Sequence, residues 1–496
     1  MFDNLRRVSR QAIAYGTADA MVLGINIVLL PIYTRVLTPD EYGVLALLLV
    51  FEAVLKPTLR CGLDSAYLRL YFDHAHEQDR PALAKTVLVF VLALNGVILA
   101  GIWLASSWLT RSLLGGLDYR VALVLVAVNT TLSNLVFLPL CQFRAQERSM
   151  LVGSLSFLRS FATVVVRLVL VVGFRQGVFG LVLADVIVTG VFVVGLGPAL
   201  RRMTDGRFSR AALQDLLQYG FPQVPQGLLG QVMAQADRYV LGLHLSLHDV
   251  GVYSIGNTLA SVLKLYPVAL ETAWMPFAFS SLKRRDAPEV FARMASYAFA
   301  LLCLAALAVT LFAGPVTRLV LPPSYFQSTV VVPVLVLGIT IQVIAWFLAT
   351  SINVAKRTSR HPMAAAAGAA ASVMGCLVLI PRFGLMGAAY GVGCGQLALT
   401  LTTAWFAQRY YPIPYEKTRL IKAGAAALAL AALGTAARTE SAWTNLGMAA
   451  LLSAAYPAVL LTVRFLQPWE SAALRHFLMT RVGSAEATSP KPGVGP

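Results

Sequence analysis

The chain has 496 residues, of which 58% are hydrophobic and only 13% are charged, whereas an ordinary soluble domain has roughly 45–50% apolar and about 25% charged residues. This balance excludes a soluble enzyme. The 40 Lys and Arg residues exceed the 23 Asp and Glu residues by 17, but so apolar a chain has little solvated surface for nucleic acid, and no nucleic-acid partner is expected.

Apolar stretches of about 20 residues, the length of a membrane-spanning helix, recur along the whole chain. Fourteen are predicted, centred near residues 22, 52, 95, 131, 161, 188, 231, 262, 302, 340, 371, 396, 428 and 453. The seventh is interrupted by Pro222 and Pro225, and the Ala-rich last pair has blurred boundaries, so twelve spans is the alternative. The first stretch has no small-residue cleavage site and is interpreted as a retained span. The chain is therefore predicted to be an all-α polytopic membrane protein.

Basic residues gather at the N-terminus and in the even-numbered connections, for example Arg201, Arg202, Arg207 and Arg210 after the sixth span. Cytoplasmic connections carry the Lys and Arg excess in membrane proteins. Both termini are therefore predicted to be cytoplasmic. The loops are short, so no soluble domain is inserted.

An internal repeat with an offset of 208 residues relates the two halves of the chain. Leu37-Thr38 corresponds to Leu245-Ser246, Gly43-Val44 to Gly251-Val252 and Lys56 to Lys264, and at an offset of 207 Gly177 and Gly180 correspond to Gly384 and Gly387. The shift equals six spans, so both copies have the same topology. Parallel repeats of this kind are related by an axis along the membrane normal, with a substrate site between the halves.

The repeat predicts two six-helix lobes around a central cavity, followed by two extra helices. The expected boundaries are 1–209 for the N-terminal lobe, 210–410 for the C-terminal lobe, 411–483 for the additional helices and 484–496 for a disordered tail. This plan is typical of a transporter rather than of a membrane enzyme.

Ionisable residues inside the predicted spans are functional candidates, because a charge at membrane depth is costly unless it faces protein or water. Glu52, Lys56, Arg60 and Asp64 are spaced by four and would share one helical face. Lys264 and Glu271 would share a face of the eighth span, so that Lys56 and Lys264 face each other across the cavity. The alternative is that these lysines and Arg60 merely extend to the lipid headgroups.

Other charges lie within the first, fifth, sixth and seventh spans, namely Asp19, Arg159, Arg167, Asp185 and Asp237-Arg238. A structural ion pair within one lobe is the alternative interpretation of Arg167 and Asp185. The seventh span also has Gln223, Gln226, Gln231 and Gln235 beside its prolines, a pattern typical of a bent helix with a polar side.

Motifs that would indicate catalysis are missing from the sequence. There is no Walker A, HExxH, GxSxG or paired CxxC motif. The five cysteines lie scattered in apolar runs, and the pair His244 and His248 is interpreted as solvated. Neither enzymatic activity nor a metal or other cofactor is expected.

Four segments carry a resemblance to a known family. The segment from Leu30 to Ala46, LPIYTRVLTPDEYGVLA, resembles the signature that follows the first helix of bacterial polysaccharide (O-antigen type) flippases. Further matches are GLDSAYLRLY at 62–71, RAQERS at 144–149 and FGLMGA at 383–388. The resemblance implies membership of the superfamily that joins oligosaccharide-lipid flippases, multidrug and toxic compound extrusion transporters and lipid II flippases.

The resemblance implies alternating access, with spans 1, 2, 7 and 8 lining the cavity. It also implies translocation of a polyprenyl-pyrophosphate-linked oligosaccharide across the bacterial inner membrane. Membrane lipids and the polysaccharide polymerase machinery are the other expected partners. The alternatives are a cation-coupled multidrug exporter and a lipid II-type exporter, although the N-terminal pattern of lipid II flippases is not found.

Two sets of residues are assigned roles in this hypothesis. Cations suited to an anionic headgroup are Lys56, Arg60, Lys264, Arg167 and Arg238. Carboxylates that would couple transport to H⁺ or Na⁺ are Asp19, Glu52 and Glu271.

Overall fold

The computed structural model describes residues 24, 28–73, 80–116, 119–270, 274, 286–467 and 470. This part of the chain is helical and has no β-strand. Its first half contains residues 28–36, which are helical, and the helices α2 (Pro39–Arg60), α3 (Leu63–Tyr71), α4 (Arg80–Leu114), α5 (Arg120–Ala145), α6 (Ser149–Leu168), α7 (Gly177–Met203) and α8 (Arg210–Gly220). Its second half contains α9 (Val224–His244), α10 (Leu247–Ala260), α12 (Ala287–Val320), α13 (Val332–Val354), α14 (His361–Phe383), α15 (Leu385–Tyr410), α16 (Lys417–Ala436) and α17 (Ala442–Thr462).

Thirteen of the fourteen predicted span centres fall within or beside these helices, and the first, near residue 22, lies outside the described residues. Ten helical stretches of the described chain are long and apolar enough to cross a membrane. Helices α9, α10 and α15 do not meet that criterion. The all-helical polytopic fold is therefore confirmed.

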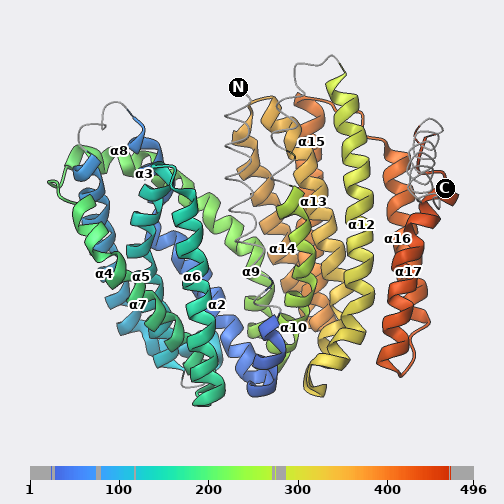
Figure 1. The fold of residues 1–496 in the computed structure, drawn as a ribbon, viewed down its shortest axis with the longest axis horizontal. Coiled ribbons are helices and arrows are strands. Elements are labelled where there is room, and N and C mark those ends of the chain that lie inside the picture. The colour runs from blue at the N-terminus through green and yellow to red at the C-terminus, as the bar shows by residue number, and fades with distance from the viewer. Residues whose placement is uncertain are drawn as a thin grey trace, which may run out of the picture.

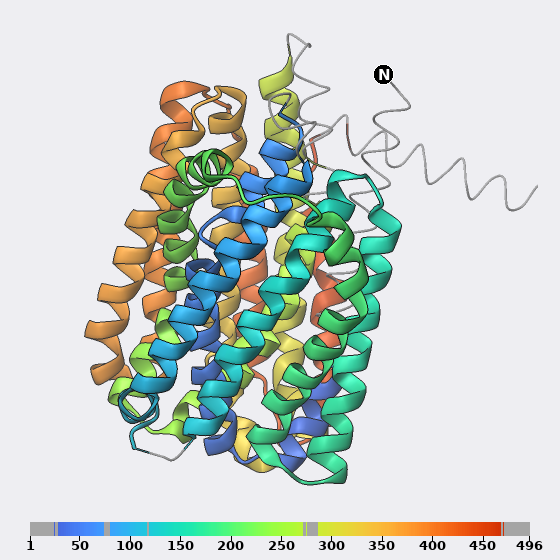
Figure 2. The ribbon, with the colours of Figure 1, turned by 90° about the vertical axis from the view of Figure 1, so that its left-hand side faces the viewer.

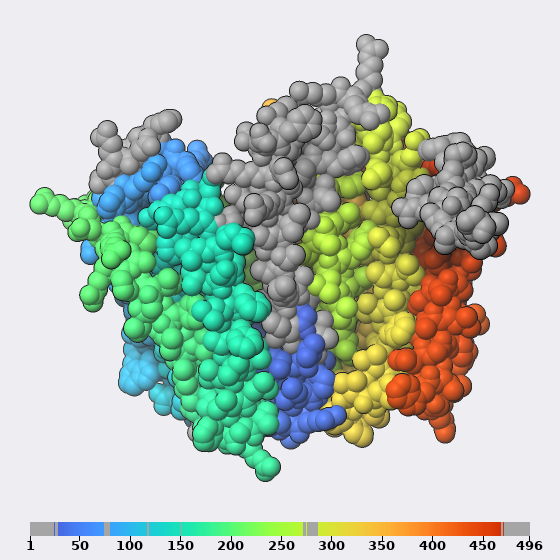
Figure 3. Space-filling view, viewed as in Figure 1, coloured from blue at the N-terminus to red at the C-terminus, as the bar shows by residue number. Residues whose placement is uncertain are grey.

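The helices form two lobes that lie side by side (Figure 1). Helices α3 to α8 form one bundle and α12 to α15 the other, while α2, α9 and α10 lie between them. The view from the side shows that the long helices run roughly parallel (Figure 2). Helices α16 and α17 lie at the outer edge of the second bundle, beside α12 (Figures 1 and 3).

The two lobes meet where α2 and α10 begin, at the edge of the molecule opposite α8 (Figure 1). A Cβ atom added to Gly43 would lie 2.0 Å from the carbonyl oxygen of Leu247, and one added to Gly251 would lie 1.9 Å from that of Pro39. The hydroxyl of Tyr325, which is fully buried, donates a hydrogen bond of 2.8 Å to the carbonyl of Leu37. Backbone contact without intervening side chains therefore closes this end of the lobe interface.

The same positions confirm the predicted repeat. Thr38 and Ser246, which are 208 residues apart, are the N-caps of α2 and α10, and each forms a capping box with an acidic residue three positions later. A capping box satisfies backbone N–H groups at a helix start. The two glycines of the lobe contact, Gly43 and Gly251, are repeat mates and pack against each other's helix. The residue boundaries of the lobes remain predictions.

The predicted connection between the lobes contains a short helix. α8 packs on the N-terminal lobe, where Ala212 and Leu216 join a buried cluster with residues of α3, α4 and α5. A 3₁₀ turn (Phe221–Gln223) then leads into α9. Pro222 lies in this turn and Pro225 in the first turn of α9, positions at which the missing N–H of proline is tolerated. The bend of the seventh span stays a prediction.

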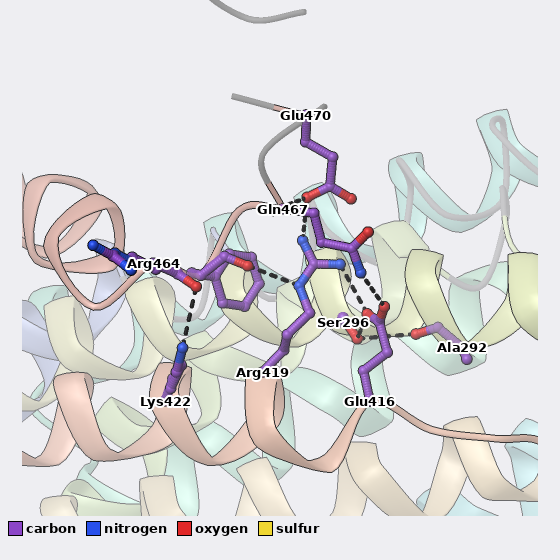
Figure 4. Close-up of polar contacts among 9 residues, drawn as sticks. Ala292, Ser296, Glu416, Arg419, Lys422, Arg464, Gln467 and Glu470 are labelled. Atoms are coloured by element: carbon purple, nitrogen blue, oxygen red, sulfur yellow. Dashed lines mark hydrogen bonds and ion pairs between the residues drawn. The ribbon is translucent and has the colours of Figure 1, made fainter. Parts of the chain in front are cut away.

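Arg419 at the start of α16 anchors the last two helices to the C-terminal lobe (Figure 4). Its guanidinium pairs with Glu416 at 2.9 Å and with Glu470, and it donates a hydrogen bond of 2.8 Å to the carbonyl of Phe465. Glu416 accepts a hydrogen bond of 2.8 Å from Ser296 of α12. Because Arg419 is buried, these partners satisfy a charge that would otherwise be costly.

The contacts of Glu470 in this cluster indicate that its contribution to the stability of the folded protein depends on pH only under acidic conditions. Burial works to raise the pKa of Glu470, but hydrogen bonds from Tyr297, the Gln467 backbone and Arg419 outweigh it and hold the pKa below its ordinary value. A carboxyl whose pKa is lowered on folding stabilises the folded state above its unfolded pKa, about 4.3, and loses that contribution as the pH falls through the lower folded pKa. We expect thermal unfolding in detergent to be insensitive to this group from pH 7 to about pH 5. Below that, Glu470→Gln should show a smaller loss of stability than the wild type, whereas equal losses would contradict this role.

Candidate substrate-binding site

Helix α2 carries three of the predicted site residues, Glu52, Lys56 and Arg60, on one face. The predicted fourth member, Asp64, does not continue that face, which corrects the prediction. Cys61 and Gly62 both adopt left-handed backbone conformations, with φ of 48° and 68°, and Asp64 belongs to the next helix, α3. Gly62 is required here because an added Cβ would lie 2.2 Å from the carbonyl oxygen of Gly220.

Lys56 has an exposed side chain and makes no hydrogen bond or ion pair with another described residue. Its charged neighbours are Arg60 and Glu52 on α2 and Arg159 on α6. Lys56 lies 13 residues beyond Gly43, or about 20 Å along the helix at 1.5 Å per residue. The lysine is therefore far from the closed end of the lobe interface.

Arg60 is held by α5. Its Nε donates a hydrogen bond of 3.0 Å to Oδ1 of Asn134, and its guanidinium lies 5.3 Å from the ring centroid of Phe137. Both contacts orient the guanidinium without a carboxylate partner. The remaining N–H groups of Arg60 have no acceptor among the described residues.

Arg159 on α6 is held in a similar way. Its Nη2 donates hydrogen bonds of 2.9 Å to the hydroxyl of Ser133 and 3.0 Å to that of Thr189. The Thr189 hydroxyl in turn donates a hydrogen bond of 2.7 Å to Asn129. Arg159 was recognised in the sequence as a charge within a span but was not included among the predicted binding residues.

Arg167, about two turns further along α6, is paired with a carboxylate. Its Nε and Nη2 donate hydrogen bonds of 2.9 and 2.7 Å to the two oxygens of Asp185 on α7. The pair is half-buried. The structure thus brings Arg167 and Asp185 together as an ion pair, and the role of Arg167 in binding substrate stays a prediction.

The C-terminal lobe contributes Lys264 and Arg238. Lys264 ends the 3₁₀ segment Ser261–Lys264 that follows α10; its side chain is exposed and forms no hydrogen bond or ion pair with another described residue. Arg238 on α9 donates a hydrogen bond of 2.7 Å to Gln235, while its buried Nε has no partner among the described residues. The neighbouring Asp237 is buried and accepts a hydrogen bond of 2.7 Å from Tyr253 of α10. Asp237 and Arg238 are the charged neighbours of Lys264.

Lys56 and Lys264 therefore occupy equivalent places in the two lobes. Each lies 13 residues beyond the glycine at the lobe contact, Gly43 or Gly251. Among the described residues, the charged neighbours of each lysine belong to its own lobe, so the two ammonium groups do not contact each other. The predicted coupling residues Asp19 and Glu271 lie outside the described residues. The described ranges contain no group of three or more His, Cys, Asp or Glu side chains that could hold a metal ion.

The arrangement gives each lobe an exposed lysine beside one or more arginines. Cations that lack carboxylate partners suit an anionic ligand, and a guanidinium offers two parallel donors to a phosphate. Sequence reasoning missed the neutral partners of these cations, Asn129, Ser133, Asn134 and Thr189. The sequence signal that could have identified them is the presence of four polar residues within two apolar helices. The arginines that they contact are distant in the sequence.

A protein family and several solved structures are similar to this chain. The family model described as "Polysaccharide biosynthesis protein" matches residues 32–330. No curated protein matches the sequence. A structure of the lipid II flippase MurJ in an inward closed conformation is similar with a TM-score of 0.72 at 10% identity, covering 92% of this chain and 99% of that chain.

Two other solved structures have the same fold. An inward-facing multidrug resistance MATE family transporter of the MOP superfamily has a TM-score of 0.64 at 15% identity, covering 76% of this chain and 92% of that chain. A MOP superfamily transporter from Pyrococcus furiosus, described as having a binding pocket of reverse polarity, has a TM-score of 0.51 at 16% identity, with coverages of 82% and 94%. At these identities the likeness shows the fold alone.

Proposed function

The chain belongs to the polysaccharide biosynthesis protein family, and we propose that it is a flippase for a polyprenyl-pyrophosphate-linked oligosaccharide. It would move this lipid from the cytoplasmic to the outer leaflet of the bacterial inner membrane, with both termini in the cytoplasm. The observation that carries the proposal is the pair of repeat-related lysines, Lys56 and Lys264. Each is exposed on its own lobe and lacks an ion-pair partner among the described residues.

The diphosphate of such a substrate requires cations that are not already neutralised. A charge-assisted hydrogen bond is stronger than a neutral one, and more so where water is scarce. Arg60 is oriented by Asn134 without losing its charge, and the Nε of Arg238 has no partner among the described residues. Together with the two lysines, these side chains give both lobes cationic groups that a diphosphate and acidic sugars could contact in turn.

The lipid part of the substrate needs an apolar path. A cavity of about 270 Å³ lies between α10 and α12 and is lined by apolar side chains that include Leu259, Val262 and Phe312. The polyprenyl chain would be accommodated on such surfaces while the headgroup occupies the interior between the lobes. This supports a lipid-linked rather than a freely soluble substrate.

Alternating access follows from the lobe contact. The glycine contact between α2 and α10 closes one end of the interface, and separating it while the opposite ends approach would expose the headgroup to the other side. Glu52, which lies beside Lys56, Arg159 and Arg167, is a candidate for coupling this change to H⁺ or Na⁺, together with Asp19 and Glu271.

A second candidate function is export of cationic drugs, because a MATE transporter has the same fold. The basic side chains of both lobes argue against it, since a cationic ligand favours an acidic site. The similar MurJ structure is described as a lipid II flippase. Lipid II is also a lipid-linked anion, so it serves as a second test substrate.

Reconstituted vesicles distinguish these candidates. Purified protein in proteoliposomes is offered a fluorescently labelled polyprenyl-pyrophosphate oligosaccharide, lipid II or a cationic dye. We expect the oligosaccharide lipid to become accessible to a membrane-impermeant quencher at least about tenfold faster than in protein-free vesicles, and the dye to be retained. Dye efflux that persists in Lys56→Ala and Lys264→Ala variants would instead favour the drug exporter.

A further inference from the structure

Three cations of the N-terminal lobe lie near one another without an ion pair among the described residues. Arg159 is a charged neighbour of both Lys56 and Arg60. The carboxylates in the vicinity, within the part of the chain that the structure describes, are Glu52, Asp64 and Asp185. Asp185 already accepts two hydrogen bonds from Arg167, and neither Glu52 nor Asp64 makes an ion pair with a described residue. Like charges brought together in this way repel each other unless an anion lies between them.

Helix α5 fixes the two guanidiniums at the same level. Ser133 accepts a hydrogen bond from Arg159 of α6, and the next residue, Asn134, accepts one from Arg60 of α2. Successive residues project about 100° apart around a helix, so the two arginines approach α5 from different sides at one height. Their partners are neutral, so the arginines are oriented but keep their full charge.

Asn134 supplies an independent observation. It is only 1% exposed, and its Nδ2 has no hydrogen-bond partner among the described residues. An unpaired buried donor costs free energy comparable to a lost hydrogen bond. A donor left without an acceptor beside the guanidinium of Arg60, one residue from the contact of Arg159, indicates that this place is built for a further acceptor.

We infer that Lys56, Arg60 and Arg159 form the binding site for the diphosphate of the substrate. The inference rests on the proposed function and adds Arg159, with Ser133 and Asn134 of α5 as positioning residues. Two guanidinium forks and an ammonium match the several oxygens of a diphosphate. Arg167 is not part of the site, because its charge is already paired with Asp185 through two hydrogen bonds.

Binding of inorganic pyrophosphate to the purified full-length protein in detergent tests this site. Isothermal titration calorimetry should give tighter binding for pyrophosphate than for orthophosphate. Arg159→Gln should weaken pyrophosphate binding by about tenfold or more, as expected for lost hydrogen bonds to a charged group, and Arg159→Lys should lose less. Ser133→Ala should weaken binding several-fold and Ser133→Thr should restore it, a rescue that a purely structural role would not give.

The matched control is Arg120→Gln. Arg120 also belongs to the N-terminal lobe and also donates to a serine of a neighbouring helix, Ser106, at 2.7 Å, but it lies at the start of α5, 13 residues before Ser133. The Arg120→Gln variant should bind pyrophosphate like the wild type. Equal binding by Arg159→Gln and Arg120→Gln, or no wild-type preference for pyrophosphate, would overturn the inference.

The outcome is separable from that of the proposed function, because pyrophosphate binding requires no translocation. If pyrophosphate binding depends on Arg159 but the protein translocates no lipid-linked oligosaccharide, the binding site is supported and the flippase function is refuted. If Arg159→Gln translocates the lipid at the wild-type rate, the flippase function is supported and the role of Arg159 in the binding site is refuted.

Discussion

Combined Lys56→Ala and Lys264→Ala substitution is expected to reduce the protein-dependent part of the translocation rate of a lipid-linked oligosaccharide by at least about a hundredfold. The two ammonium groups are exposed, occupy equivalent positions in the two lobes and have no ion-pair partner among the described residues. Each single substitution should cost about tenfold or more, because hydrogen bonds to charged groups contribute about 1.5–3 kcal/mol each. The measurement is the initial rate of translocation in proteoliposomes.

A lysine outside the lobe interface provides the control. Lys422 on α16 is half-buried and donates a hydrogen bond of 3.2 Å to the carbonyl of Arg464. Lys422→Ala should leave the rate unchanged, and Lys56→Arg should retain much of it because the charge is kept. Wild-type rates in both alanine variants would show that these lysines only extend to the headgroups.

The second large effect is expected from Gly251→Ala. The added Cβ would lie 1.9 Å from the carbonyl oxygen of Pro39 and close to the backbone of Gly43, so α2 and α10 must separate. Backbone displacement of this kind costs about 1–3 kcal/mol. We expect a lower thermal midpoint in detergent, a more accessible lobe contact and impaired transport, because the conformation closed at this end is disfavoured.

Gly190→Ala is the matched control for this substitution. Gly190 lies within α7 and has no atom within 4 Å of an added Cβ, and alanine is the better helix former. Its thermal midpoint should stay the same or rise. A Gly251→Ala protein as stable and as active as Gly190→Ala would mean that the lobe contact is not required.

The features that the sequence could predict are those set by local pattern and by repetition. Apolar stretches located the spans, and the repeat placed Gly43 opposite Gly251 and Lys56 opposite Lys264. Both pairs depend on residue type and spacing alone. The role of Gly43 in close packing was not predicted, because a neighbour distant in the chain, the carbonyl of Leu247, determines it.

The features that the sequence could not predict depend on backbone conformation and on partners distant in the chain. The break at Cys61 and Gly62 ended the expected charged face before Asp64, since the pattern of fours does not reveal a left-handed backbone. Neutral residues such as Ser133 and Asn134 attract no attention in a search for charged residues, although they orient Arg159 and Arg60. A search for charged residues therefore identifies the cations but not the neutral side chains that orient them.

The most direct test of the flippase is the rate at which purified wild-type protein translocates a labelled polyprenyl-pyrophosphate oligosaccharide in proteoliposomes. Protein-free vesicles and vesicles with the Lys56→Ala, Lys264→Ala double variant are measured beside it. We expect the wild type to exceed protein-free vesicles by at least about tenfold and the double variant to approach them. A wild-type rate equal to that of protein-free vesicles would refute the flippase function.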